Sequence, residues 1–425
     1  MRLGAASVLL TYQVDKLVYT AGVRYNILYI LVRPIYLITG DLTKFTMAAT
    51  AEKINKRAHF AAKVTFNNNN SQFFKSLKRS VDDYFKTTGL KPTGNWKLYH
   101  KALVLIPSAL IIYVSLLAFS DTMPVVASLS LCALLGLIIS AIGFNIMHDS
   151  CHGAYSSKKW VNTILGFSLN AIGGNAFFWK QKHNILHHTY TNIQGVDDDI
   201  AQSKLLRQSP TQDWMPIHKY QHYYLPIAYS LTIFMWAWVR DFEKYFTKKI
   251  HNTQLQPMER SEHWIFWISK ILYAVFYVAI PIYFVGFLPW LIGYVTMGLV
   301  LSVFIAFVFQ LAHAVEGPEF SAAGLEDKVI ETEWAIHQIK TTANFAPENK
   351  LVNWVVGGLN FQVEHHLFPR ISHVHYPQIS KIVKAHCEQY GLPYHSFPTV
   401  GDALKSHFRT MKQFGQKDFV PDYAQ

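Results

Sequence analysis

Four long apolar stretches constrain this chain more than any other feature of its sequence. They cover residues 102–120, 124–147, 271–288 and 290–312. A helix needs about 20 mainly apolar residues to cross the hydrocarbon core of a membrane, and each stretch reaches or approaches that length. Very short turns, 121–123 and 289, join the first stretch to the second and the third to the fourth. We therefore expect an all-α integral membrane protein with four transmembrane helices in two hairpins.

The composition agrees with a membrane protein. Of the 425 residues, 51% are hydrophobic and 16% are charged, whereas globular chains carry about 25% charged residues. The three cysteines, Cys132, Cys151 and Cys387, lie far apart, so a disulfide framework and a zinc ribbon are not supported. The formal net charge of +12 is compatible with nucleic acid, anionic lipid or an acidic protein. Because no nucleic-acid-binding motif is present, we expect membrane lipid as a partner and no nucleic acid.

The basic residues predict how the chain is oriented. Neither hairpin turn contains Lys or Arg, whereas every long connection does, so both termini and the large middle loop are expected in the cytoplasm. Two further apolar stretches in that loop, 160–179 and 223–239, are interrupted by polar or small residues such as Asn162 and Gly173. We interpret both as interfacial or re-entrant helices. A bacterial cell membrane is the favoured location and the endoplasmic reticulum the alternative.

The domain organisation follows from the apolar stretches. We expect a cytoplasmic basic lead-in over 47–101, a membrane domain over 102–410 and a C-terminal tail over 411–425. Residues 1–46 form a doubtful N-terminal extension without a signal-peptide cleavage pattern. Our hypothesis is that Met47 is the true start; a disordered or interfacial tail is the alternative.

Histidines gather where the chain leaves the membrane. Eight of them, on the cytoplasmic side of the predicted topology, are His148 and His152 in "HDSCH", His183, His187 and His188 in "HNILHH", His313 in "QLAHAVE", and His365 and His366 in "QVEHH". Residues i and i+4 share one face of an α-helix, so we expect His148 to point with His152 and His183 with His187. Gln362 precedes His365 by three residues and His366 by four, so on an α-helix its side chain would lie on the same face as theirs.

Imidazole is the commonest metal ligand near neutral pH, and it suits iron, zinc, copper and nickel. Eight converging imidazoles exceed the four ligands of a zinc site and would suit two metals in one pocket. A single histidine at a span end, such as His313, is more often an interfacial or core residue. The three clusters in "HDSCH", "HNILHH" and "QVEHH" all fall on the same predicted side of the membrane, and this shared placement favours a metal centre. We expect five other histidines, His59, His100, His218, His222 and His251, to be surface residues.

The motifs "HDSCH", "HNILHH" and "QVEHHLFP" resemble the three histidine boxes of membrane-bound fatty acid desaturases. The glutamine that opens the third box resembles the front-end, linoleoyl-CoA desaturase-like subgroup. That subgroup inserts a double bond between an existing one and the carboxyl end of a polyunsaturated acyl chain. The resemblance covers about residues 65–410. It implies an oxygen-dependent, di-iron enzyme that acts on an acyl-CoA or an acyl-lipid, with its histidine-rich site in a cytoplasmic helical cap.

The resemblance also implies the residues of the site. The two irons would be held by His148, His152, His183, His187, His188, His313, His365 and His366. The amide oxygen of Gln362 could ligate a metal or accept a hydrogen bond from a metal-bound water. No catalytic residue is expected beyond these ligands. Residues that could orient the imidazoles are Asp149, Asn192, Asp197, Asp198, Asp199, Asn360 and Glu364, with His373 and His375 close by. For the three aspartates, a solvated polar loop is the alternative.

The electrons are expected to come from a separate carrier. The sequence has no His-Pro-Gly-Gly motif of a fused haem domain and no ferredoxin cysteine pattern. An external donor of ferredoxin or cytochrome b5 type is therefore expected. The basic residues Lys158, Lys159, Lys180 and Lys182 could steer such a donor if it is acidic, and contact with lipid headgroups is the alternative.

Two other functions remain open at this point. A di-iron lipid-chain hydroxylase would use the same oxidant and return oxygen to the carbon; the "QVEHHLFP" motif argues against it. A non-catalytic membrane protein that binds metal, such as a transporter, would place its ligands near the middle of the spans. Here the histidines lie at the ends of the spans.

Overall fold

The computed structural model describes residues 64–69, 71–200, 204–251, 253–323 and 329–421 of the chain. The predictions for residues 1–46 and Met47, and for the outer parts of the lead-in and the tail (47–63 and 422–425), lie outside the described residues.

Four long helices form the centre of the described part. They are α5 (Trp96–Ala118); α6 (Val125–Ile142) with its continuation through η1 (Gly143–Met147) and α7 (His148–His152); α15 (Arg260–Ala274) with η6 (Val275–Ala279) and α16 (Ile280–Val285); and α17 (Phe287–His313). Among the described residues these are the helices long and apolar enough to cross a membrane, with mean hydropathies from 1.9 to 2.6. The predicted fold class is confirmed.

The long helices extend beyond the apolar stretches from which they were predicted. The first begins at Trp96 instead of 102, and the third begins at Arg260 instead of 271. Asn95 stabilises the start of α5 because its side-chain oxygen accepts a 2.9 Å hydrogen bond from the Lys97 N–H. The added turns carry polar side chains near the membrane surface, so apolarity alone does not reveal them.

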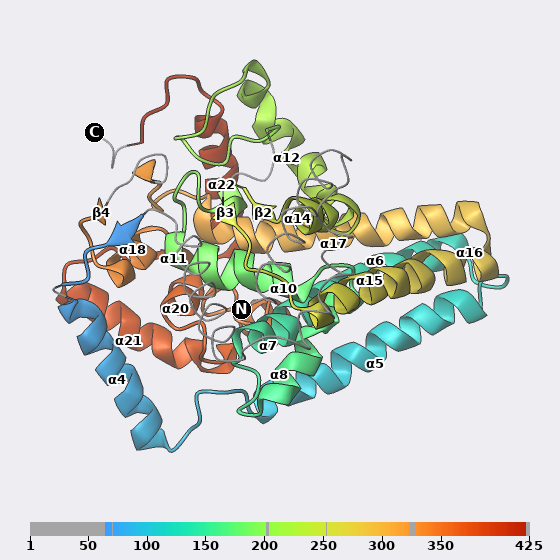
Figure 1. Cartoon of the computed structure of the whole chain (residues 1–425), viewed down its shortest axis with the longest axis horizontal. Helices are drawn as coiled ribbons and strands as arrows, with labels where there is room; N and C mark the ends of the chain where they lie inside the picture. Colours follow the sequence, from blue (N-terminus) through green and yellow to red (C-terminus); the bar gives the residue numbers. More distant parts are fainter. Residues whose placement is uncertain (1–63, 70, 201–203, 252, 324–328, 422–425) are drawn as a thin grey trace, which may run out of the picture. The chain divides into compact units, whose positions relative to one another are not determined.

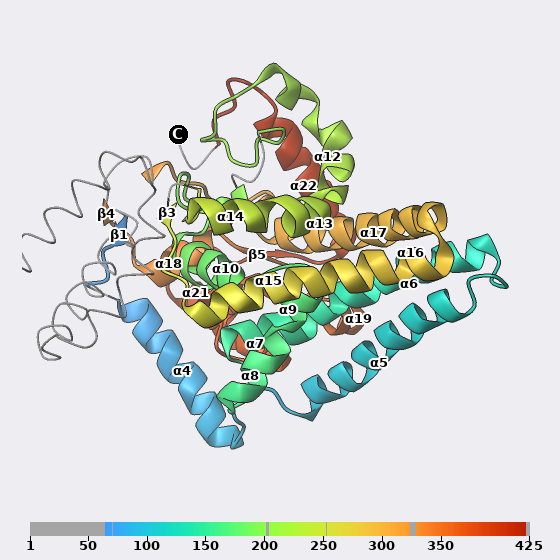
Figure 2. The same ribbon diagram turned by 45° about the vertical axis from the view of Figure 1, so that its right-hand side comes forward.

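The long helices pack side by side, with α6 in contact with both α5 and α17 (Figures 1 and 2). Gly136 permits the close approach of α6 to α17, because a Cβ atom there would lie 2.5 Å from the carbonyl oxygen of Met297. Buried side chains such as Ile139 and Leu301 fill the space between these helices. The bundle provides a rigid base for the histidines at its end.

The two interrupted apolar stretches form short, broken helices. They are α8 (Lys159–Gly166), α9 (Ser168–Ala171) and α10 (Ala176–Trp179) in the first, and α12 (Gln221–Ser230), α13 (Thr232–Met235) and the π-helix η5 (Trp236–Arg240) in the second. Gly173 breaks the first stretch with a φ of 97°, a conformation that favours glycine. Trp160 and Ile164 on α8, and Tyr223 and Ile227 on α12, are exposed. Such apolar faces suit helices that lie in a membrane interface.

A cap of short elements covers one end of the long helices (Figure 1). Its helices are α4 (Gln72–Thr88), α11 (His188–Tyr190), α14 (Asp241–Thr247), α18 (Trp334–Lys340), α19 (Lys350–Val355), α20 (Gln362–Leu367), α21 (Tyr376–Gln389) and α22 (Val400–Phe414), with the π-helix η2 (Lys180–His187) and the 3₁₀ turns η3 (Asp198–Ile200), η4 (Pro216–Tyr220) and η8 (His373–His375). Phe73, Leu77, Val81 and Phe85 repeat at helical spacing on α4 and are buried in a shared core with α18, α20 and α21.

The described part of the chain contains three small two-stranded sheets, of which two join segments distant in sequence and one is a local hairpin. The pairs are β1 (Thr65–Phe66) with β4 (Val329–Ile330), parallel; β2 (Lys249–Ile250) with β3 (Thr253–Gln254), antiparallel; and β5 (Ala343–Phe345) with β6 (His395–Phe397), parallel. The β5–β6 pair holds the segment that precedes the third histidine box beside the segment that leads into α22.

Helix α22 continues through residue 410, where the membrane domain was expected to end. Met411 and Phe414 are buried in a core that includes α12. The Arg207 guanidinium donates hydrogen bonds of 2.9 Å to the carbonyl oxygens of Phe414 and Gln416. The packed part of the chain therefore reaches into the segment that was expected to be a tail.

Candidate metal centre

The structure brings all eight predicted histidines into one buried cluster. Seven form two groups whose ligand nitrogens lie within 4.8 Å of one another: His148, His152, His183 and His365 in the first, and His187, His313 and His366 in the second. His188 lies between the groups, since its ring centroid is 4.5 Å from those of both His365 and His366. Each of the two groups could hold a metal ion.

Helix α7 carries the first histidine box. It continues the second long helix, and the ring centroids of His148 and His152 lie 4.6 Å apart on one face. This agrees with the α-helical i, i+4 spacing predicted for the pair.

The second box has a different local structure from the predicted α-helix. Residues 180–187 form the π-helix η2, in which residue i is bonded to residue i+5. His188 therefore returns to the side of His183, and their Nε2 atoms are 3.2 Å apart. His187 joins the second group, where its ring centroid is 4.8 Å from that of His313.

The third box divides its two histidines between the groups. Both lie on the short helix α20, but the ring centroid of His365 is 4.5 Å from that of His148, whereas the ring of His366 is 4.9 Å from that of His313. Gln362 is buried on the same helix, and its Nε2 has no hydrogen-bond partner in the described part of the chain. A role for Gln362 as a ligand stays a prediction.

The unpaired nitrogens of the cluster suit bound metal. Within the cluster, five buried imidazole nitrogens lack a hydrogen-bond partner in the described part of the chain: Nε2 of His152, His313, His365 and His366, and Nδ1 of His188. Buried polar atoms are ordinarily paired, and several unpaired imidazole nitrogens in one pocket are what metal coordination would satisfy.

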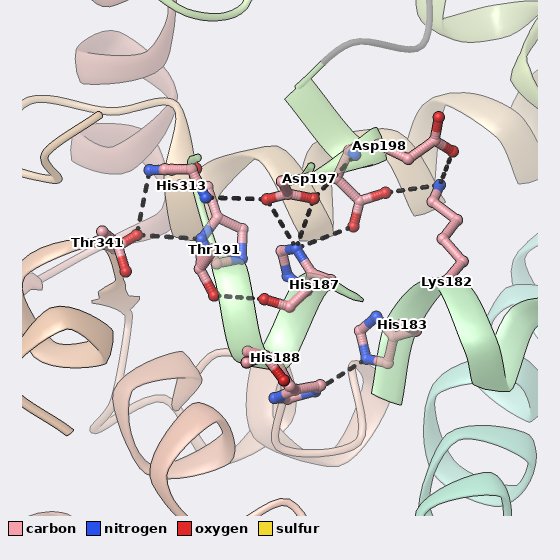
Figure 3. A network of polar contacts seen from close by, with 12 residues as sticks. Lys182, His183, His187, His188, Thr191, Asp197, Asp198, His313 and Thr341 are labelled. Carbon is pink, nitrogen blue, oxygen red and sulfur yellow. Dashed lines mark hydrogen bonds and ion pairs between the residues drawn. The ribbon is translucent and has the colours of Figure 1, made fainter. Parts of the chain in front are cut away.

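Asp197 orients His187 (Figure 3). The two carboxylate oxygens of Asp197 lie 3.1 and 3.2 Å from His187 Nδ1, and the Asp199 carboxylate lies 3.3 Å from the same atom. An Nδ1–H bonded to a carboxylate leaves Nε2 available to a metal. Asp198 does not bond this ring; it forms an ion pair with Lys182 at 3.4 Å.

Three other rings of the cluster are held in the same manner by partners that the sequence did not reveal. His313 Nδ1 lies 3.2 Å from the Thr341 carbonyl oxygen, His366 Nδ1 lies 2.9 Å from Gln338 Oε1, and His365 Nδ1 lies 3.2 Å from the Tyr376 hydroxyl. These partners lie on α18, in the turn that follows it and on α21. The sequence did not reveal them because no motif marks them.

The remaining residues proposed to orient imidazoles support the backbone around the site. Asn192 donates its N–H to Asp197 and its side-chain amide to the carbonyl oxygens of Glu319 and Thr341. Asn360 donates to the Ala346 carbonyl oxygen. Neither side chain has a recorded hydrogen bond to a ring of the cluster.

Asp149 and Glu364 also bond elsewhere. The Asp149 carboxylate accepts a 2.7 Å hydrogen bond from the Ser372 hydroxyl and lies 3.0 Å from His373 Nδ1. His373 was expected to lie close to the site, and it is buried there. The Glu364 carboxylate accepts hydrogen bonds from Asn344 and from the Tyr394 hydroxyl.

Two predictions about surface residues are wrong. His218 is 2% exposed, because its ring lies between the Met215 N–H and the Lys204 carbonyl oxygen. Lys182 is not available to a docking partner, since its ammonium group is largely buried and paired with Asp198 and, at 2.6 Å, with Asp199 (Figure 3).

The electrostatics keep most of the cluster neutral. Burial, reinforced by the neighbouring imidazoles, holds the pKa values of His183, His188, His365 and His366 well below the usual value. Burial also acts to lower the pKa of His187, but Asp197 and Asp199 outweigh it and raise this pKa. Neutral imidazoles need not lose a proton before they bind metal.

Comparisons with known proteins agree on one family. The sequence profile described as "fatty acid desaturase" matches residues 124–398. The chain is 38% identical over 364 residues to an sn-1 linoleoyl-lipid 6-desaturase of Arthrospira platensis, covering 83% of this chain and 95% of the relative. It is 36% identical to the enzyme of the same name from Synechocystis, covering 81% and 96%. It is 34% identical to an acyl-lipid (8-3)-desaturase of Physcomitrium patens, covering 83% and 74%.

Proposed function

This chain belongs to the fatty acid desaturase family, and from that premise we propose that it is a front-end desaturase of a lipid-bound polyunsaturated acyl chain. The double bond would be inserted between an existing one and the carboxyl end. Relatives named as linoleoyl-lipid 6-desaturases favour a linoleoyl group esterified to a glycerolipid, desaturated at carbon 6. Acyl-CoA is the alternative form of the substrate.

One observation carries the proposal: two groups of buried imidazole nitrogens gather where two of the four membrane-length helices end, at His152 and at His313. The substrate's adjacent methylenes have no acidic C–H bond, so acid–base groups cannot remove their hydrogens. A metal centre at the end of membrane-length helices suits a reaction on an acyl chain that itself lies in the membrane.

We propose two irons as the metals, one in each group, with His188 between them. Iron held there would supply activation of oxygen and acceptance of electrons. In the overall reaction, one oxygen molecule, two external electrons and two protons combine with two hydrogens removed from adjacent methylenes. The products are one double bond and two water molecules.

The protein's own part is to fix the ligands and exclude water. Trp179 covers the first group: its ring stacks on that of His183 at 4.3 Å and lies 5.7 Å from His148 and 5.6 Å from His152. The Asp197 carboxylate and Gln338 Oε1 accept hydrogen bonds from His187 Nδ1–H and His366 Nδ1–H and hold these two rings in place. A dry, fixed set of ligands suits an oxidant that must react with one selected bond.

We also propose that a separate carrier delivers the electrons, and that the cap lies in the cytoplasm of a bacterial cell. The exposed lysines Lys158 and Lys159 stand at the start of α8, close in sequence to His152. They suit contact with an acidic carrier.

The experiment that tests the proposal is product analysis. Cells that lack such an enzyme would express the wild type or His187→Ala and receive linoleic acid, and their fatty acids would be analysed by gas chromatography–mass spectrometry. We expect one new triunsaturated acid, with its added double bond at carbon 6, from the wild type alone. A hydroxylated product would establish the hydroxylase instead. Iron bound without any product, even with an electron carrier supplied, would favour the non-catalytic protein.

A further inference from the structure

A cavity of about 260 Å³ is lined in part by Lys180, Gln181 and Ile185 of η2, the helix that also carries histidines of the second box. The rest of its wall comes mainly from α8, α10 and the first turns of α15, and none of the eight histidines of the cluster lines it. Thr163 and Gln256 of the lining are exposed, so the cavity is open to the surroundings of the protein. It is therefore a site separate from the metal centre.

The cavity lies at the level expected for lipid headgroups. Its wall includes Glu262 and Ile265 in the first turns of α15, before the apolar stretch that begins at 271. Trp264 in those turns is 70% exposed, and Trp160 on α8 is 63% exposed. Exposed tryptophans are typical of the interface between hydrocarbon and water. The head of a lipid whose chains lie in the membrane would therefore be at the height of the cavity.

Gln181 has a donor with no partner. Its side chain is 4% exposed, and its Oε1 accepts a 2.7 Å hydrogen bond from the Gln256 N–H. Because an N–H can only donate, this contact fixes which end of the amide faces Gln256. The Nε2 group is thereby turned away, and it has no hydrogen-bond partner in the described part of the chain. Buried donors are ordinarily paired, so this one is suited to an acceptor oxygen of a ligand.

Two opposite charges line the same cavity. Lys180 and Glu262 are both half-buried, and neither side chain has a hydrogen bond or ion pair recorded in the described part of the chain. Charges removed from water are costly unless they are paired. A ligand with a negative group for Lys180 and a positive group for Glu262 would pair both. Phe167 and Phe177 offer apolar wall to the carbon atoms of such a ligand.

We propose that the cavity binds the head of a zwitterionic phospholipid that carries a phosphate and a primary ammonium group and is not consumed in the reaction. The phosphate accepts hydrogen bonds from Lys180 and from Gln181 Nε2–H, and the ammonium group donates to the Glu262 carboxylate. Phe167 and Phe177 contact the glycerol carbons. The cavity is smaller than the roughly 300–1,000 Å³ of sites for drug-sized molecules, so it holds the head while the acyl chains stay in the membrane.

A lipid bound in this way would join α8, η2 and α15, which are distant in sequence. It would therefore stabilise the outer side of the helix that supplies histidines to both groups. The inference does not rest on the proposed function, because no residue of the metal centre takes part in it.

The first test compares phospholipids that differ in the head alone. The purified full-length protein in detergent would be titrated with phosphatidylethanolamine, phosphatidylglycerol or phosphatidylcholine, all with the same saturated chains, and bound lipid would be measured by native mass spectrometry. We expect the wild type to bind phosphatidylethanolamine about tenfold more tightly than the other two. Phosphatidylglycerol has no cation, and the quaternary ammonium of phosphatidylcholine has no N–H to donate.

Equal binding of the three lipids by the wild type would overturn the inference. So would a requirement for linoleoyl chains with the same head, because it would make the bound lipid a substrate.

Variants of the lining identify the cavity as the site. Glu262→Gln should bind phosphatidylethanolamine and phosphatidylglycerol equally, whereas Lys180→Gln and Gln181→Leu should bind both about tenfold more weakly than the wild type. Glu259→Gln is the matched control, because Glu259 is exposed directly before α15 and does not line the cavity. It should keep the wild-type preference. A preference retained in Glu262→Gln, or lost equally in Glu259→Gln, would exclude this cavity.

Thermal stability gives a second readout. A ligand that binds only the folded state stabilises it, so phosphatidylethanolamine should raise the Tm of the wild type by several degrees and that of Gln181→Leu much less. Far-ultraviolet circular dichroism of each variant is the folding control. An unchanged wild-type Tm would contradict the inference. A shift of the same size with soluble glycerophosphoethanolamine would overturn the assignment to a membrane lipid. None of these results depends on whether the wild type forms a desaturated product.

Discussion

At the scale of single residues, the centre depends on side chains that never touch a metal. His366 lies in the second group, and the Gln338 Oε1 lies 2.9 Å from its Nδ1. The Thr191 hydroxyl donates to the same oxygen at 2.9 Å and so fixes the position of the Gln338 side chain. Such partners set the direction of the ligand lone pair, and their loss typically lowers metal affinity 10–100-fold.

Gln338→Leu should therefore weaken the second group selectively. Leucine removes the acceptor for His366 Nδ1–H but keeps a similar volume, so the fold should be retained. After mild chelation, we expect the variant to keep about one iron per chain instead of two, as measured by elemental mass spectrometry. Its desaturase activity should be at least tenfold lower than that of the wild type. Gln338→Glu, which keeps an acceptor oxygen, is the matched control and should retain more iron. Equal loss from both variants would refute the orienting role.

The predictability of these residues differs for a physical reason. Seven of the eight histidines could be predicted from their short spacings, whereas His313, which stands alone in the sequence, was assigned through the resemblance to a family. Gln338, Thr341 and Tyr376 could not be predicted, because no motif marks them and each reaches its ring from a different element. Asp197 was found because it follows the second box closely and carries a charge.

At the scale of elements, the π-helix η2 is the feature that the sequence did not predict. An α-helix and a π-helix have similar side-chain patterns over a single turn, so the spacing in "HNILHH" could not separate them. The wider turn places His183 and His188 in contact while His187 joins the other group. One short element thus contributes to both histidine groups. π-Helical turns are frequent at functional sites.

Helix α8 provides a test of the docking of the electron carrier. Lys158 and Lys159 are exposed at its N-terminus, where basic residues oppose the helix dipole. The double variant Lys158→Glu, Lys159→Glu should not destabilise α8, because acidic residues are favoured at that end. We expect turnover with an acidic carrier to fall several-fold at low ionic strength, and its dependence on salt to weaken.

Lys412→Glu is the control for this variant. Lys412 is also exposed, but α22 and α8 lie on opposite sides of the long helices (Figures 1 and 2). Stopped-flow reduction of the enzyme would measure both variants. If Lys412→Glu slowed reduction as much as the double variant, docking at α8 would be excluded.

At the scale of the whole molecule, the cluster joins all parts of the fold. Its histidines come from the ends of two long helices, from η2, from α11 and from α20. The long helices were predictable from apolarity alone, whereas the cap was not, because its short helices and strands are stabilised by contacts between distant segments. The metals should therefore contribute to the stability of the cap more than to that of the long helices.

Removal of metal should lower the thermal stability without unfolding the long helices. Any ligand that binds only the folded state stabilises it, by about 2.7 kcal/mol at 100 times its Kd. We expect chelation to lower the Tm by several degrees in differential scanning fluorimetry, with most of the far-ultraviolet circular dichroism retained. His187→Ala combined with His366→Ala should show a smaller shift. An unchanged Tm in the wild type would mean that the cap is stable without metal.

The division of His365 and His366 between the two groups also bears on how the protein is made. Translation proceeds from the N-terminus, and most of the chain is made before α20. His148, His152 and His183 can meet early, whereas the second group has only His187 and His313 until α20 emerges and brings His365 to the first group and His366 to the second. The two proposed metals would therefore have different histories: the first would find three of its four histidines while the ribosome is still at work, and the second would find only two of its three before the chain is nearly finished.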